Sequence, residues 1–213
     1  MAVYDLEEQE KIASMKAWWE QYGKYVSGTV TVVCVIIIAV QGWRWYTRSQ
    51  SEKAAVLYQA ISQAATQNAP DKAKDAAAQL LDKYPGSAYA SRAALIMAKI
   101  AVEANDKALA KTQLQWVIDR ASEDEMKQIA RLRLAYVLLD EKAYDDALRT
   151  LDAKHDDKLD GLYADAKGDI LAAAGKLQEA RAAYQAALNK MDPKGPLRNY
   201  VQLKLDSIGE AAK

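Results

Sequence analysis

Hydrophobic and polar positions divide the chain into three stretches with different patterns. Residues 1–24 are rich in charged side chains, residues 26–43 carry no charge, and from residue 47 onward apolar positions recur at helical spacing. Eighteen uncharged residues with aromatic flanks approach the ~20 that cross a bilayer as a helix. We therefore predict an all-α chain, in which a single N-terminal transmembrane helix at residues 25–46 precedes a helical domain at residues 47–213.

The residues around the apolar segment support a membrane anchor but give it no direction. Tyr22 and Tyr25 precede the segment and Trp43, Trp45 and Tyr46 follow it, as is typical of the two membrane interfaces. A cleaved signal peptide is a poorer interpretation, because the apolar run is long, a charged leader precedes it and no small-x-small cleavage site follows. The positive-inside rule is undecided, since Lys11, Lys16 and Lys24 precede the segment and Arg44, Arg48 and Lys53 follow it.

The leader at residues 1–24 leaves two interpretations open. Ile12, Met15, Trp19 and Tyr22 recur at helical spacing, which indicates an amphipathic helix lying on the membrane or on a partner. The alternative is a frayed tail that runs into the anchor. No proline or glycine interrupts residues 48–53, so the anchor helix is free to continue into the first helix of the domain.

Three segments of the domain repeat one pattern of small and large residues. In each, a small residue is followed twelve positions later by alanine, and four positions further by a large apolar residue. This spacing favours pairs of antiparallel helices, because a small side chain permits close approach and a large one fills the adjoining space. The three sets, which start 37 and then 33 residues apart, are Ala98, Ala110 and Leu114; Ala135, Ala147 and Leu151; and Gly168, Ala180 and Tyr184.

Short turns separate the helices of each predicted pair. Asn105 and Gly175 stand where a helix ends in the left-handed conformation. Upstream, residues 52–66 and 71–84 predict a further helix pair. Downstream, Pro196 starts a final helix, which we expect to cap the open end of the stack.

Composition argues against several classes of function. Lys+Arg and Asp+Glu both number 29 and the pI is near 6.6, so there is no electrostatic case for nucleic-acid binding. The single cysteine, Cys34, lies in the apolar segment, and the single histidine, His155, lies in a polar stretch that we interpret as a solvated loop. One cysteine and one histidine exclude a zinc site of the Cys/His type. Without a catalytic constellation or a phosphate-binding loop, we expect no enzyme, no cofactor and no metal.

The repeats resemble the tetratricopeptide repeat (TPR), above all the third unit, which runs from Gly168 through Tyr184 to Pro193. No tryptophan opens a unit and Lys167 replaces the consensus leucine, so the repeats are irregular. The resemblance implies a TPR-like helical-hairpin solenoid whose first helices line a concave, protein-binding face. The groove positions that it carries over are Arg92, Lys99 and Glu103, then Tyr136 and Asp140, then Asp165 and Asp169. This set is basic towards one end and acidic towards the other. The alternative to a protein-binding groove is an ordinary solvated helix face.

The order of the parts resembles the YfgM family of proteobacteria, an ancillary subunit of the SecYEG translocon, over the whole chain. The leader and the span are the more specific part of the resemblance, and the repeats alone are not specific. The leader residues that carry it are Asp-Leu-Glu-Glu-Gln-Glu at residues 5–10 and Lys-Ala-Trp-Trp-Glu-Gln-Tyr-Gly at residues 16–23. It implies a bacterial inner-membrane protein with a cytoplasmic N-terminus and a periplasmic repeat domain. The implied partners are the SecYEG translocon, a membrane-anchored periplasmic chaperone of the parvulin type, and translocating client proteins. The implied role is to assist the handover of newly translocated proteins to periplasmic chaperones.

Two other functions share the features of the sequence. One is a TPR adaptor or regulator that tethers an envelope-assembly or division complex without handling clients. The other is a regulator that sequesters a cytoplasmic partner through residues 1–25, and it is compatible with either role. In each case the apolar segment makes membrane lipid a further expected partner.

Overall fold

The computed structural model describes the backbone of residues 2–211 and the side chains of residues 8–209. This part of the chain consists of helices joined by turns and loops and contains no strand. It separates into two compact units, Met1–Gln50 and Ser51–Lys213, the second of which we call the repeat unit. The elements are α1 (Ala2–Thr66), α2 (Pro70–Lys83), α3 (Ala88–Glu103), α4 (Lys107–Arg120), α5 (Asp124–Asp140), α6 (Tyr144–Leu151), the 3₁₀ helix η1 (Asp157–Leu159), α7 (Asp160–Ala173), α8 (Leu177–Lys190) and α9 (Pro196–Ala211).

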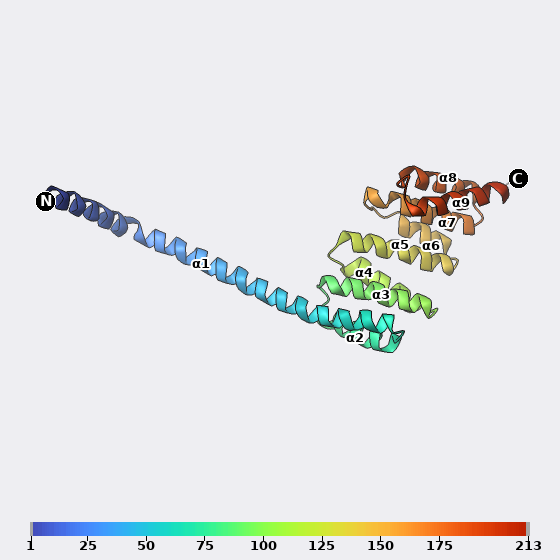
Figure 1. The fold of residues 1–213 in the computed structure, drawn as a ribbon, viewed down its shortest axis with the longest axis horizontal. Helices are drawn as coiled ribbons and strands as arrows, with labels where there is room; N and C mark the ends of the chain where they lie inside the picture. The colour runs from blue at the N-terminus through green and yellow to red at the C-terminus, as the bar shows by residue number, and fades with distance from the viewer. Residues whose placement is uncertain (1, 212–213) are drawn as a thin grey trace. The chain divides into compact units, whose positions relative to one another are not determined.

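The first unit consists of one helix. α1 continues without a break to Thr66, as the absence of a linker allowed (Figure 1). Among the described residues it is the helix long and apolar enough to cross a membrane, and its apolar stretch is not buried within the protein. The hydroxyls of Thr29 and Thr31 donate to the carbonyls of Tyr25 and Ser27, both at 2.8 Å. These polar side chains are therefore satisfied inside the helix, as lipid requires.

The repeat unit stacks antiparallel helix pairs one after another (Figure 1). The end of α1 packs with α2 and α3 through a cluster that includes Ile61, Leu80 and Met97. α3 pairs with α4, α5 with α6 and α7 with α8, and α9 packs on α8 to close the stack. The predicted fold class, an all-α TPR-like solenoid with a capping helix behind an apolar N-terminal helix, is confirmed.

The repeated small and large residues are the contacts between paired helices, as predicted. All nine residues of the pattern are buried. The closest approach is at Gly168, where an added Cβ would lie 2.5 Å from ring carbons of Tyr184. Contact this close has no room for a methyl group, so the small residue on α7 is what admits the tyrosine ring of α8.

The predicted turns adopt the expected conformation, and two further residues, Asn68 and Lys142, adopt it as well. Asn105 and Gly175 have φ values of 58° and 78°, the left-handed conformation expected of them. Lys142, in the equivalent turn between α5 and α6, has a φ of 60°. Its residue type does not favour this conformation, so the register of the repeat imposes it there.

His155 differs from the sequence prediction. It lies in the loop before η1, but its side chain is only 23% exposed rather than solvated. Its ring stacks on Tyr163 with centroids 3.9 Å apart, and its Nε2 lies 3.2 Å from an Asp160 carboxylate oxygen. The neighbouring Asp156 accepts a hydrogen bond from the backbone N–H of Lys158 at 2.9 Å, as a helix cap. The prediction missed these contacts because the partners of His155 come from the following helix.

Candidate protein-binding face

Four of the seven predicted groove residues line one hollow between α3 and α5. The hollow has a volume of about 370 Å³ and an apolar floor formed by Ala98, Val102, Leu114 and Val137. Val102 is 44% exposed and Tyr136 is 36% exposed, so apolar surface is open to solvent here. The remaining lining residues are Lys99, Glu103, Arg133, Tyr136 and Asp140.

Charges around the hollow are mixed rather than graded. Lys99 Nζ lies 3.6 Å from Glu103 Oε1, one helical turn away. Arg133 and Asp140 add one more charge of each sign to the lining. The hollow therefore carries two charges of each sign, and the gradient from a basic end to an acidic end stays a prediction.

Arg92, the first of the predicted groove residues, is engaged elsewhere on α3. Its Nη2 lies 3.3 Å from a carboxylate oxygen of Glu123, the residue that precedes α5. Its Nη1 donates to the carbonyl of Ala88 at 2.8 Å. The ion pair with Glu123 therefore connects the start of α3 to the start of α5. Arg92 is not among the residues that line the hollow.

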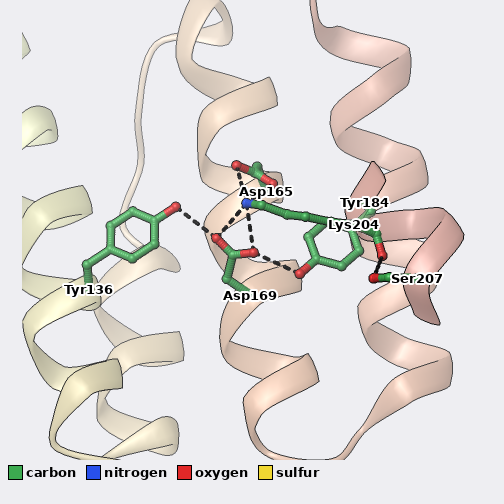
Figure 2. A network of polar contacts seen from close by, with 6 residues as sticks. All are labelled: Tyr136, Asp165, Asp169, Tyr184, Lys204 and Ser207. Carbon is green, nitrogen blue, oxygen red and sulfur yellow. Dashed lines mark hydrogen bonds and ion pairs between the residues drawn. The ribbon is translucent and has the colours of Figure 1, made fainter. Parts of the chain in front are cut away.

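The last two predicted residues, Asp165 and Asp169 of α7, belong to a polar network (Figure 2). The ammonium of Lys204, from α9, lies 2.9 Å from Asp165 and 2.8 Å from Asp169. Asp169 also accepts hydrogen bonds from the Tyr184 hydroxyl at 2.7 Å and the Tyr136 hydroxyl at 3.2 Å. We call these five residues the carboxylate network; it connects α5, α7, α8 and α9.

Burial and charge explain how the network titrates. Burial raises the pKa of Asp165, and the hydrogen bond from Lys204 offsets this only in part. Burial also acts to lower the pKa of Lys204, but its hydrogen bonds to Asp169 and Asp165 outweigh it and raise that pKa above 10.5. The pKa of Asp165 therefore rises because of burial, whereas the pKa of Lys204 rises because two carboxylates surround one cation. Burial and then the charge of Asp169 raise the pKa of Tyr136 as well.

Sequence reasoning missed Lys204 and the second role of Tyr184. Lys204 lies 35 and 39 residues beyond the carboxylates that it contacts, and no local pattern marks such a pair. Tyr184 was predicted only as a large residue that fills space, whereas its hydroxyl also anchors Asp169. A buried tyrosine generally finds a hydrogen-bond partner for its hydroxyl, which is the signal that would have suggested a polar neighbour.

Tyr136 connects the hollow to the carboxylate network. Its ring lines the hollow, and its hydroxyl donates to Asp169. The row of first helices α3, α5 and α7 therefore presents one continuous face, which continues onto α9 through Lys204. Within the described residues no group of three or more His, Cys, Asp or Glu side chains is arranged to hold a metal ion. What the face offers is apolar surface, hydrogen-bonding groups and paired charges.

Comparison with known proteins shows similarity over both units. Residues 16–210 match the tetratricopeptide repeat-like domain family. A protein of Neisseria gonorrhoeae (strain ATCC 700825 / FA 1090), called "Ancillary SecYEG translocon subunit", is 33% identical over 210 residues, which cover 95% of this chain and 98% of that protein. A protein of Escherichia coli (strain K12) with the same name is 28% identical over 212 residues, 98% of this chain and 99% of its own length. The matched regions include the apolar segment as well as the repeats.

Proposed function

Because the chain belongs to the family of ancillary SecYEG translocon subunits, the YfgM family, we propose that it is a membrane-anchored scaffold of the Sec translocon that assists chaperone handover of newly translocated proteins. The observation that carries this proposal is the match to the Neisseria protein over 98% of that protein's length. Repeat domains of this kind occur with many functions. Because the match also includes the apolar helix, it supports a shared cellular location as well as a shared fold.

The proposed topology follows from the anchor and the role. One N-terminal apolar helix in a translocon-subunit family fits a single-pass inner-membrane protein. In the proposal residues 1–24 are cytoplasmic, residues 25–46 span the membrane and residues 47–213 form the periplasmic domain. The flanking basic residues are balanced, so the direction rests on the family and on function: a face that receives polypeptides leaving the channel must lie on the exit side.

The proposed partners divide between the two units. The exposed apolar helix is the part available to membrane lipid and to the SecYEG channel. The face formed by α3, α5, α7 and α9 is the part available to clients and to a membrane-anchored periplasmic chaperone of the parvulin type. Stacked helix pairs bind proteins through such a face, and the solvent-exposed apolar floor of the hollow supports this assignment.

Labelling of single cysteines tests the topology. With Cys34→Ala as background, Ser14→Cys and Ser87→Cys place one thiol in the leader and one just before α3. A membrane-impermeant thiol reagent added to intact spheroplasts is expected to label position 87 and not position 14. The reverse result would place the repeats in the cytoplasm and rule out the handover role.

Purification and crosslinking test the function itself. A tagged chain extracted in mild detergent is expected to co-purify with the SecYEG channel. A photo-crosslinker at Lys99 or Tyr136 is expected to capture secreted proteins only while secretion is active, whereas one at Gln185, on the exposed side of α8, is expected to capture few. Crosslinks to one fixed envelope protein, unchanged when secretion is blocked, would favour the adaptor that handles no clients.

A further inference from the structure

Exposed apolar side chains of the repeat unit are concentrated in two places. Among its described residues, six large hydrophobic side chains are exposed, and two of them belong to the hollow between α3 and α5. Three more lie on α9, and one lies on α1. The six are Val102 and Tyr136; Leu197, Tyr200 and Leu203; and Val56.

The three exposed residues of α9 form one flank of that helix. Leu197, Tyr200 and Leu203 are 52%, 67% and 67% exposed, whereas Val201 and Leu205 are buried against the preceding helices. A terminal capping helix is expected to turn a polar surface to solvent. This helix instead exposes an apolar flank, which we call the α9 flank.

The α9 flank lies on the same side of the stack as the hollow. Leu197 and Tyr200 precede Lys204 by seven and four residues, so all three share one face of the helix. Lys204 contacts Asp169, and Asp169 accepts a hydrogen bond from Tyr136 in the hollow. The carboxylate network, drawn in Figure 2, therefore connects Tyr136 of the hollow with the helix that carries the α9 flank.

Helix packing sets the distance between the two sites. Neighbouring packed helices lie roughly 8–10 Å apart. α5 packs on α7, and α9 lies against α7 through the contacts of Lys204 and through the cluster that joins Leu171 with Val201 and Leu205. Tyr136, at the α5 side of the hollow, and the α9 flank are then roughly 20 Å apart. An extended chain advances about 3.3 Å per residue, so it covers this distance in roughly six residues.

The charges on this face favour an uncharged ligand. Two cations and two carboxylates line the hollow. In the network, Lys204 lies between Asp165 and Asp169 and contacts both. Recognition of an acidic or basic motif depends on an excess of the opposite charge. A face with nearly balanced charge discriminates against such motifs, and apolar contact remains as its source of affinity.

We propose that this face binds an extended, uncharged polypeptide segment with two large apolar side chains roughly six residues apart. One side chain enters the hollow and the other packs on the α9 flank, while the residues between them cross the carboxylate network. The proposal rests on the proposed function, since such segments are exposed by unfolded proteins that have just left the translocon.

Designed peptides test the spacing. The probe is a fluorescent 16-residue peptide of Ser, Thr, Asn and Gly with two leucines six residues apart, titrated with the full chain in detergent micelles and followed by anisotropy. It is expected to bind at least about tenfold more tightly than peptides with the leucines two residues apart or with one leucine, since one buried anchor contributes about that factor. Equal affinity for the three peptides would overturn the proposal.

Matched substitutions test the two sites. Val102→Gln in the hollow and Tyr200→Gln on the α9 flank are each expected to weaken binding of the probe about tenfold. Val56→Gln, an equally polar change at an exposed residue of α1, is expected to leave it unchanged, and circular dichroism checks folding. Unchanged binding in the first two variants overturns the proposal; if Tyr200→Gln also converts a dimer to a monomer in sedimentation, the flank joins two copies instead. Co-purification with SecYEG is scored separately, so failure here is distinguishable from failure of the proposed function.

Discussion

The hollow and the carboxylate network lie along the same row of helices, yet one is open and the other is closed. In the hollow, the side chains of Lys99 and Glu103 are 72% and 62% exposed. In the network, the side chains of Asp165, Asp169 and Lys204 are 15%, 19% and 35% exposed. The same repeat positions are therefore exposed to solvent at one end and contribute to stability at the other. What separates the two is the cation that α9 supplies.

Burial decides how much each ion pair stabilises the fold. An exposed pair such as Lys99 with Glu103 typically contributes about 0–1 kcal/mol, since water screens both charges. A largely buried carboxylate that loses its cation is left poorly solvated, and the cost is several times larger. Substitutions in the hollow and in the carboxylate network measure this difference in stabilisation.

The largest effect is expected at the close contact beside the network. Gly168→Val forces two methyl groups into a space where even a Cβ lies 2.5 Å from the Tyr184 ring. Overpacking of this kind is expected to lower the free energy of unfolding by about 3 kcal/mol. Urea unfolding of the full chain in detergent, followed by circular dichroism, measures it. Gly86→Val is the control, because a Cβ at Gly86 meets nothing within 4 Å. Similar losses of stability in both variants would contradict close packing between Gly168 and Tyr184.

Removal of the cation directly compares the network with the hollow. Lys204→Met is expected to lower the free energy of unfolding by about 2 kcal/mol, less than for a fully buried pair because Lys204 is partly exposed. Lys99→Met, the same change beside the hollow, is expected to alter it by less than about 0.5 kcal/mol. The same unfolding experiment measures both variants. Equal losses of unfolding free energy would mean that the contacts of Lys204 stabilise the fold no more than the exposed ion pair of Lys99.

Alkaline pH is expected to weaken the network selectively. Burial, then the hydrogen bond to Asp169, raises the pKa of Tyr184 above the ordinary 10.0. The unfolded chain therefore releases this proton near pH 10.0 and the folded chain only at higher pH, so the stabilisation is complete below pH 10.0 and is lost as the pH rises. The raised pKa of Lys204 acts in the same direction above 10.5.

Replacement of the phenol isolates its part in this pH dependence. Between pH 10 and pH 11, the free energy of unfolding of Tyr184→Phe is expected to fall by about 1 kcal/mol less than that of the unmodified chain. Urea titrations at the two pH values measure the difference. Tyr200→Phe, at an exposed ring, is the matched control. An identical fall in Tyr184→Phe and the unmodified chain would show that this phenol is not protected in the folded state.

The smallest effect is expected where the two regions meet. Tyr136→Phe removes the 3.2 Å hydrogen bond to Asp169 but keeps the ring in the hollow. The free energy of unfolding is expected to fall by about 0.5 kcal/mol, as for a partly exposed hydrogen bond. Affinity for the two-leucine peptide is expected to stay the same. A large loss of affinity would mean that the hydroxyl, not the ring, contacts the ligand.

The sequence alone predicted the structural features that depend on residues close together in the chain. The spacing of Gly168, Ala180 and Tyr184 predicted the helix contact, because a helix pair brings residues twelve to sixteen apart together in a regular way. Asn105 predicted a left-handed turn through its residue type. Lys142 takes the same conformation without such a preference, so only the alignment of the repeats could have indicated it.

Contacts between distant helices were beyond the sequence. The carboxylates of Asp165 and Asp169 were predicted as open groove positions. The repeat consensus gives the position of a residue within its own helix pair, but not the side chains that a later helix places beside it. Whether Lys204 points to solvent or to α7 depends on the rotation of α9 about its axis. That rotation is set by the burial of Val201, Leu205 and Ile208. Helical spacing identifies these residues as one apolar face, but it does not say which helix covers that face.

The place of Lys204 on α9, which follows all the helix pairs, has a consequence for how the protein is made. A chain still being synthesised already carries Asp165 and Asp169 before their cation exists, so this part of the stack cannot close until α9 has been completed. Truncated products would retain the anchor and most of the repeats but expose Leu171 and Leu188, which α9 covers. Such products are expected to be cut rapidly by cellular proteases, so degradation removes incomplete copies.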